Sequence, residues 1–363
     1  MKKIKFLMIA MMAIIASVGF VACSDDDDDI SNTERYQRAV DENVKANKKS
    51  NKAILLVAFG STWQQAYDAF DATKRAYESQ FSGYDVYLSF SSAICINRAA
   101  AGENVAPRNF YAPQYWLEAF GRVKYQEIIV QSLQVIPGEE YGRVVNAVKD
   151  FANNANGDID DEYLSKVTLK IGLPLLADAE TDVNNVALAI DANFKSNAAQ
   201  GVVAFMGHGN PDEYDTYKAN IRYTQLEEAL QKINKNYFVG TVDMADNFKV
   251  QVRGRMQAAG IKSGKVFCAP LMSIAGDHAH NDMAGDDLAE GVTKFSDFEV
   301  NSEGEVEDTS WKNYFGIAGA GYTCDDNTML TKGLLEYDNI RQIWMNHTRQ
   351  AEVVDYYHSK NRE

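Results

Sequence analysis

Cysteine is scarce in this 363-residue sequence, and the cysteines present do not form a recognisable framework. After Cys23 there are only Cys95, Cys268 and Cys324. An odd number of cysteines without close spacing is typical neither of a disulfide scaffold nor of a zinc knuckle. One disulfide remains an open alternative, but we expect buried free thiols.

Basic residues are also in deficit. The chain has 36 Lys and Arg residues against 51 Asp and Glu. Residues 1–22 contain three of the lysines and no acidic residue, so the chain from Cys23 onward has 33 basic and 51 acidic residues, a formal charge of −18. Such a surface repels phosphate backbones, which argues against nucleic acid as a partner. Repeats of 20–50 residues are absent as well, which excludes solenoid folds.

Only one long apolar run occurs, and it lies at the N-terminus. Lys2, Lys3 and Lys5 precede an apolar stretch at 6–22 that ends before Cys23. A cationic start, an apolar centre and small residues before the break predict a secretory signal peptide over 1–22. "FVAC" also resembles a bacterial lipobox, which implies lipidation of Cys23 and attachment to a membrane. An ordinary cleaved signal with an incidental cysteine is the alternative.

Five consecutive aspartates, at 25–29, follow Cys23 almost directly. Like charges repel one another and stay solvated, so we expect residues 23–50 to form an acidic tether or linker with, at most, a lead-in helix. Cys-Ser-Asp-Asp-Asp resembles the export signal of surface-exposed lipoproteins in Bacteroidetes-type bacteria. The resemblance implies an outer-membrane lipoprotein exposed at the cell surface, with a periplasm-facing protein as the alternative.

Beyond residue 50, apolar strand patterns alternate with helical patterns. Strands are predicted at 52–60, 85–92, 127–136, 166–176, 201–209, 237–243 and 265–276. Helices are predicted at 63–81, 112–123, 138–154, 183–197, 223–233, 247–260 and most of 328–357. This alternation predicts an α/β fold in which parallel sheets are covered by helices on both faces.

The alternating pattern starts again near residue 175. We therefore expect an N-terminal α/β domain at 51–175 and a C-terminal α/β domain at 176–363 that ends in a closing helix. Residues 288–309 are acidic and polar, and we interpret them as an inserted loop or small hairpin.

Histidine is rare too, and three of the five histidines lie in two short motifs. "FMGHGN" contains His208, and "GDHAHNDMAGDD" contains His278 and His280; His347 and His358 are expected on the surface of the closing helix. His208 and His278 each follow a predicted strand, and Asp243 ends the strand between them. Parallel strands bring such residues to the edge where α/β sheets bind ligands. Two imidazoles and a carboxylate there predict a site for a first-row divalent cation with open coordination positions.

Several motifs in this order resemble the anaerobic sirohydrochlorin cobaltochelatases of the CbiK type. They are "KAILLVAFGST", "VQSLQVIPGEEY", "GLPLL", "VVAFMGHG", "FVGTVD" and "APLMSIAGDHAHNDMAGDD", followed by "SWK" and "KGLLEYDNIRQIW". The resemblance spans about 52–348. It implies a class II chelatase-like fold: two α/β domains related by a pseudo-twofold axis, with a tetrapyrrole cleft between them.

The same resemblance implies roles for individual residues. His208 and His278 match the metal-binding and proton-accepting histidines. Asp243 falls where the family has a metal-binding glutamate, so this carboxylate reaches about 1.5 Å less. Glu139 and Glu140 match an acidic motif that faces the cleft. An acidic helix N-terminus explains those two residues equally well.

The cleft needs walls and cations that suit a flat macrocycle with many carboxylates. We assign Phe59, Ser61 and Met206, with Glu140, to tetrapyrrole contacts, and we name Trp63 and Phe90 as further candidates, although core packing competes for each. A local basic patch is needed because the protein is acidic. Its candidates are Arg98, Arg108, Lys218 and Arg222, for which the alternative is a solvated surface charge.

The expected function is ATP-independent insertion of Co²⁺ into a sirohydrochlorin-type tetrapyrrole by a membrane-anchored enzyme. Fe²⁺ and Ni²⁺ are alternative metals, and a homo-oligomer is an option. The competing hypothesis is a surface lipoprotein that binds haem, a corrinoid or a metal ion on a chelatase scaffold without catalysis. The shortened carboxylate at Asp243 and the segment 288–309 favour binding, and the two retained histidines favour catalysis.

Overall fold

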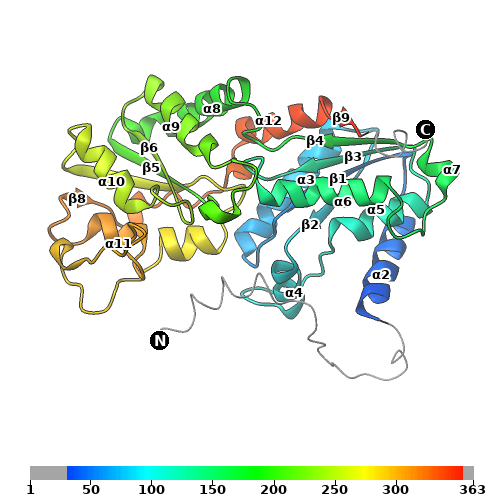
Figure 1. The fold of residues 1–363 in the computed structure, drawn as a ribbon, viewed down its shortest axis with the longest axis horizontal. Coiled ribbons are helices and arrows are strands. Elements are labelled where there is room, and N and C mark those ends of the chain that lie inside the picture. The colour runs from blue at the N-terminus through cyan, green and yellow to red at the C-terminus, as the bar shows by residue number, and fades with distance from the viewer. Residues whose placement is uncertain (1–30, 355–363) are drawn as a thin grey trace.

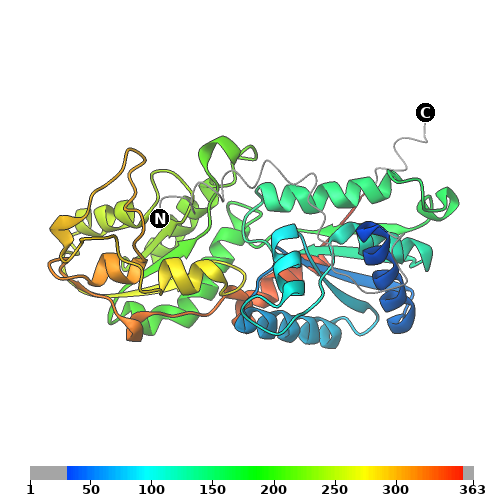
Figure 2. The same ribbon diagram turned by 90° about the horizontal axis from the view of Figure 1, so that it is seen from below.

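The structure is a computed structural model that describes residues 31–354. The signal segment, Cys23, the aspartate run and His358 lie outside this range. Figures 1 and 2 show two α/β halves arranged along the long axis of the molecule. No helix within residues 31–354 is both long enough and apolar enough to cross a membrane.

Each half contains one sheet. The strands of the first sheet are β1 (Lys52–Ala58), β2 (Asp85–Phe90), β3 (Glu127–Ser132), β4 (Thr168–Gly172) and β9 (Glu352–Val353). The strands of the second are β5 (Gly201–Gly207), β6 (Tyr237–Thr241), β7 (Gly264–Pro270) and β8 (Tyr322–Thr323). All seven strands predicted from the sequence are present. They are shorter than predicted because the last residues of each pattern belong to the loop that follows the strand.

The two sheets share one strand order. It is β2-β1-β3-β4 in the first sheet and β6-β5-β7-β8 in the second, and all these pairs are parallel. A repeated order of this kind relates the halves as a pseudo-twofold pair. Together with the helices that cover the sheets, it confirms the α/β fold class expected from the sequence.

Helices connect the strands and cover the sheets (Figure 1). In the first half they are α2 (Asn32–Asn47), α3 (Gln64–Gln80), α4 (Ala93–Ala101), α5 (Pro113–Arg122), α6 (Glu139–Ala152) and α7 (Asp161–Leu164). In the second they are α8 (Thr181–Ala198), α9 (Ile221–Ile233), α10 (Lys249–Ala258) and α11 (Trp311–Gly316). The last helix of the described chain is α12 (Asp338–Arg349). Short single-turn helices are η1 (Asp212–Tyr214), η2 (Ala279–Met283), η3 (Phe295–Asp297), η4 (Asp326–Thr328) and η5 (Leu334–Glu336).

Two boundaries differ from expectation. The closing helix α12 packs on β3 and β4 of the first sheet, and β9 pairs antiparallel with β4, so residues 338–354 complete the first half rather than the second. Residues 32–47 form the lead-in helix that the sequence allowed within 23–50, so the first half begins before residue 51. A capping box between Ser31 and Glu34 starts this helix, which buries Val40 and Val44 and packs against α5.

Three hydrophobic clusters hold this arrangement together. One covers the outer face of the first sheet and one covers a face of the second. The third is continuous across both halves and includes Ile54 of β1, Phe205 of β5 and Trp344 of α12. The shared core places the carboxyl ends of the strands of both sheets against a common region. The segment 288–309 contains η3 and otherwise irregular backbone, held by stacking of Arg253 over Phe295 at 3.8 Å and by donation from Gln251 to the Gly304 carbonyl.

Candidate functional site

Three strand ends of the second sheet carry the candidate residues. His208 follows β5 directly, Asp243 follows β6, and His278 immediately precedes η2 after the loop that leaves β7. Gly209 turns the chain after His208: its φ is 76°, and a Cβ there would lie 2.9 Å from Met244. Glycine adopts this left-handed conformation without strain, so the tight turn depends on it.

The two histidines lie together. The centroids of their rings are 4.8 Å apart, and the ring planes meet at 86°. Both side chains are partly open to solvent, with exposed fractions of 46% for His208 and 34% for His278. Residues 70 positions apart in the sequence therefore present two imidazoles at one accessible place.

Hydrogen bonds determine which nitrogen of each ring faces outward. His208 Nδ1 lies 2.7 Å from the Gly209 carbonyl oxygen, and His278 Nδ1 lies 2.5 Å from Asp282 Oδ2. A carbonyl oxygen only accepts, so His208 Nδ1 must carry the hydrogen, and the lone pair is then on Nε2. In both rings Nε2 is the atom left to accept a proton or bind a metal ion.

The two imidazoles have opposite electrostatic environments. Burial, and then the neighbouring His278, lower the pKa of His208, and the Asp243 carboxylate offsets only part of this effect. Burial alone would also lower the pKa of His278, but its hydrogen bond and ion pair with Asp282 outweigh burial and raise that pKa. His208 is therefore the more readily neutral of the pair, and His278 is the one held by a carboxylate.

Asp243 lies at the edge of this pair. Its Oδ2 is 3.5 Å from His208 Nδ1. Across residues 31–354, no group of three or more His, Cys, Asp and Glu side chains is arranged to hold a metal ion. The three-ligand set of His208, Asp243 and His278 is thus not preassembled, although its members are neighbours.

The residues predicted to line the tetrapyrrole cleft differ in their exposure to solvent. Phe59, at the end of β1, is 41% exposed and available to a ligand. Met206 is 0% exposed and packs in the core of the second half, so its assignment as a tetrapyrrole contact is wrong. Phe90 is equally buried. Ser61 is also buried, and its Oγ accepts a hydrogen bond from the backbone N–H of Trp63, which gives it a role in the turn after β1.

The two glutamates at the start of α6 face different partners. Glu139 reaches the second half, where Oε1 accepts a hydrogen bond from the backbone N–H of Thr216 at 3.1 Å. Burial raises the pKa of Glu140, whose Oε2 lies 3.5 Å from Ser91 Oγ. The pKa of Cys95 is raised by burial first, and the charges of Glu140 and Asp277 contribute. Glu140 and Asp277 therefore approach the same region from opposite halves.

Most of the cations expected in a basic patch have partners within this chain. Arg108 makes two hydrogen bonds with Asp71, and Arg98 pairs with Glu103 at 3.4 Å. Arg222 donates to the carbonyl oxygens of Leu176 and Ala177. Three of the four predicted cations therefore form hydrogen bonds or ion pairs with groups of this chain.

Sequence reasoning missed the groups that hold His278. Asp282 lies four residues after His278, a spacing that brings side chains together on one helical face and could have indicated the contact. Trp63, from the first half, stacks on His280 with ring centroids 4.0 Å apart and planes 12° apart. This long-range contact has no local sequence signal. His347, expected at the surface, is buried and hydrogen-bonded to Asp182.

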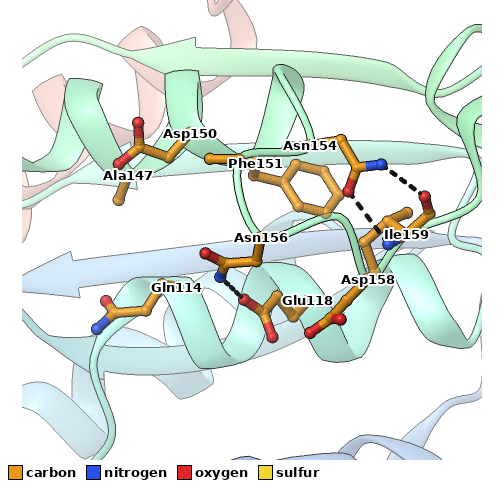
Figure 3. Close-up of a pocket in the computed structure, with 10 residues that line it drawn as sticks. Gln114, Glu118, Ala147, Asp150, Phe151, Asn154, Asn156, Asp158 and Ile159 are labelled. Carbon is orange, nitrogen blue, oxygen red and sulfur yellow. Dashed lines mark hydrogen bonds between the residues drawn. The ribbon is translucent and has the colours of Figure 1, made fainter.

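A shallow pocket on the first half lies away from these residues (Figure 3). It is lined by Gln114, Glu118, Ala147, Asp150, Phe151, Asn154, Ala155, Asn156, Asp158 and Ile159. Asn156 donates to Glu118, and Asn154 bonds the backbone of Ile159, so these polar groups of the lining satisfy one another. It adjoins the end of α6 that is remote from the second sheet (Figure 1), and nothing about it indicates a ligand.

Comparisons with known proteins identify the family of this chain. Residues 52–304 match the family described as "Cobalt chelatase (CbiK)". The chain is 28% identical over 304 residues to sirohydrochlorin cobaltochelatase CbiKC of Nitratidesulfovibrio vulgaris, covering 83% of this chain and 91% of that protein. It is 26% identical over 301 residues to the sirohydrochlorin cobaltochelatase of Salmonella typhimurium, covering 83% and 96%.

A solved structure shares the fold. SirB from Bacillus subtilis with Fe³⁺ superimposes with a TM-score of 0.51 at 14% identity, covering 82% of this chain and 94% of SirB. At that identity the likeness concerns architecture alone. The family match spans more than half of the chain and includes the motifs of His208, Asp243 and His278. The chain therefore belongs to the cobalt chelatase (CbiK) family.

Proposed function

We propose that this protein inserts Co²⁺ into a sirohydrochlorin-type tetrapyrrole without ATP. The observation that carries the proposal is the pair of neighbouring, accessible imidazoles of His208 and His278. Family membership and two relatives named as sirohydrochlorin cobaltochelatases support the choice of metal and macrocycle. Fe²⁺ and Ni²⁺ remain the competing metals in the test below.

Metal insertion must remove two pyrrole N–H protons and deliver a partly dehydrated cation. We assign proton acceptance to His208, because its Nδ1–H is bound to the Gly209 carbonyl and its lowered pKa keeps the ring neutral, with a lone pair on Nε2. Neutral imidazole is also a good ligand for Co²⁺. One ring can then serve in turn as ligand and base.

We assign metal holding to His278 together with His208, with Asp243 as the carboxylate of the set. A site that gives up its metal must not bind it too tightly, and closed four-ligand sites are typical of permanent structural metals. An incompletely assembled set suits a transfer site. On this proposal Co²⁺ is a substrate that the protein passes on.

The decisive assay mixes the protein with sirohydrochlorin and Co²⁺, without ATP, and follows the absorbance change of the macrocycle. We expect a rate well above that of the same mixture without protein, and a lower rate with Fe²⁺ or Ni²⁺. If the rate equals the protein-free control, the catalytic proposal fails.

Asp282 offers a prediction at this site. Replacing it with asparagine should lower the pKa of His278 and reduce the rate of cobalt insertion by about 10–100-fold, as is typical when the hydrogen-bond partner of a metal-binding histidine is lost. Histidine NMR across a pH series measures the pKa, and the absorbance assay measures the rate. Asp286→Asn is the matched control, because Asp286 is exposed and pairs with Lys312. Equal rates in the two variants would show that Asp282 does not support His278 in cobalt insertion.

Non-catalytic binding is the second candidate. Arg98, Arg108 and Arg222 pair with groups of this chain, which leaves Lys218 of the four cations predicted for a ligand with many carboxylates. This observation favours a ligand with fewer carboxylates, such as haem, or a metal ion alone. A protein that shifts the visible spectrum of haem but shows no cobalt insertion above the control would support this candidate.

We further propose that the protein is an outer-membrane lipoprotein, exposed at the cell surface and attached through lipidated Cys23. The support is the sequence alone: the cationic and apolar N-terminus, the lipobox-like "FVAC" and the aspartate run. Cys23→Ala should abolish incorporation of radiolabelled palmitate and release the protein from the membrane fraction. Palmitate labelling that persists in the variant would contradict lipidation at Cys23, and proteolysis of intact cells distinguishes a surface-exposed from a periplasm-facing protein.

A further inference from the structure

Trp63 belongs to the first half and contacts the second half next to the histidine pair. It lies in the turn between β1 and α3, and its indole stacks on the His280 ring with centroids 4.0 Å apart. Its Nε1–H also donates to Asp277 Oδ1 at 3.3 Å. One side chain of the first half thus contacts residues on both sides of His278.

The segment around His278 is organised by contacts of this kind. Asn281 donates to Asp277 Oδ1 at 2.9 Å, the same oxygen that accepts from Trp63. His278 itself is bound to Asp282 within the segment. The segment is therefore held internally by two side-chain hydrogen bonds, together with backbone hydrogen bonds such as that from His280 N–H to the Gly276 carbonyl oxygen, and externally by the indole.

The His280 ring is held at one edge by a hydrogen bond with the backbone of Ala275. Its Nε2 is buried and has no hydrogen-bond partner within residues 31–354. Trp63 stacks on one face of this ring, and loss of the indole would uncover that face and loosen a ring that the Ala275 hydrogen bond holds at one edge. Because His280 lies in η2 and His278 immediately precedes that short helix, displacement of His280 would move His278.

We propose that Trp63 is a positioning residue for His278: by stacking on His280 and binding Asp277, it holds the His278 imidazole beside His208. The inference rests on the proposed function for its kinetic consequence, but the geometry it describes is measurable without catalysis. On this proposal, a residue of the first half positions a histidine pair that lies wholly in the second half.

The kinetic test compares Trp63→Ala with Trp63→Phe. Loss of the ring should lower kcat for cobalt insertion by about 10–100-fold, with KM for sirohydrochlorin changed by less than about threefold, because a residue that acts through a metal ligand affects turnover rather than macrocycle binding. Phenylalanine keeps a ring against His280 and should restore most of kcat. Trp116→Phe is the matched control: Trp116 lies on α5, its Nε1 has no partner within residues 31–354, and both kinetic constants should stay unchanged.

The structural test needs no activity. The protein has only five histidines, so labelling histidine alone gives a simple NMR spectrum. Ring protons of His208 and His278 should show a nuclear Overhauser contact in the wild-type protein, since their centroids are 4.8 Å apart. The contact should disappear in Trp63→Ala and in His280→Ala, and persist in Trp63→Phe and Trp116→Phe.

Each outcome bears on the inference. A contact that persists in both alanine variants overturns it, whatever happens to the rate. A rise in KM with unchanged kcat also overturns it, because Trp63 would then contact the tetrapyrrole. If the wild-type protein inserts no cobalt while the NMR contact is lost as expected, the positioning role stands and the proposed function alone fails. If Trp63→Ala does not fold, the NMR contact is compared between His280→Ala, which removes the other ring of the stack, and Trp63→Phe, which keeps both rings.

Discussion

Replacing His208 with alanine should lower kcat/KM for cobalt insertion by about 10²–10⁴-fold, the usual contribution of a positioned acid or base. The variant loses the Nε2 lone pair that we assign to proton acceptance, together with one of the two imidazoles offered to the metal. Absorbance of the macrocycle during insertion measures the effect.

The same variant should fold normally, because the His208 side chain is nearly half exposed and packs in no core cluster. A thermal melt within a few degrees of the wild-type protein is the control. Added imidazole should restore part of the rate by entering the open position. A variant that keeps full activity would show that His208 takes no part in the reaction.

Replacing His347 with alanine should lower the free energy of unfolding by about 3 kcal/mol, at the lower end of the range for a buried ion pair that loses one partner. His347 Nε2 lies 3.1 Å from Asp182 Oδ1, and its Nδ1 lies 3.2 Å from the Leu173 carbonyl oxygen. The contact joins α12, which completes the first half, to the first turn of α8 in the second. Without His347, the Asp182 carboxylate stays buried, and within residues 31–354 its remaining hydrogen-bond donor is the backbone N–H of Asp178.

Denaturant unfolding of the variant measures this loss. Asp182→Ala in the His347→Ala background is the informative comparison, because removing both partners leaves no uncompensated group and should recover part of the stability. A single variant as stable as the wild-type protein would show that this contact is not needed to hold the halves together.

The fold was largely predictable because its strongest signals are local. Each strand such as β1 is a short apolar run bounded by a turn, and each covering helix has its own periodicity. The sheet membership of residues 338–354 was not predictable. An amphipathic helix such as α12 shows which face is buried, but the sheet it packs against depends on contacts with β3 and β4 far away in the sequence.

The candidate site was predictable where strand ends determine position. His208, Asp243 and His278 each follow a strand of one parallel sheet, so topology alone brings them to one edge. Met206 was misjudged because a strand buried on both faces gives no alternation to show which side chains reach solvent. His347 could have been recognised as buried, since Ile340, Trp344 and His347 repeat at helical spacing along one face of α12.

The account's central claim is that His208 and His278 hold one cation between them. Titration of Co²⁺ into histidine-labelled protein, followed by NMR, tests it directly, because the paramagnetic ion shifts or broadens only the rings near it. The two ring signals should change together and saturate at one Co²⁺ per chain, while those of buried His347 stay in place. Changes at only one of the two rings, or saturation of the two at different Co²⁺ concentrations, would contradict a shared site.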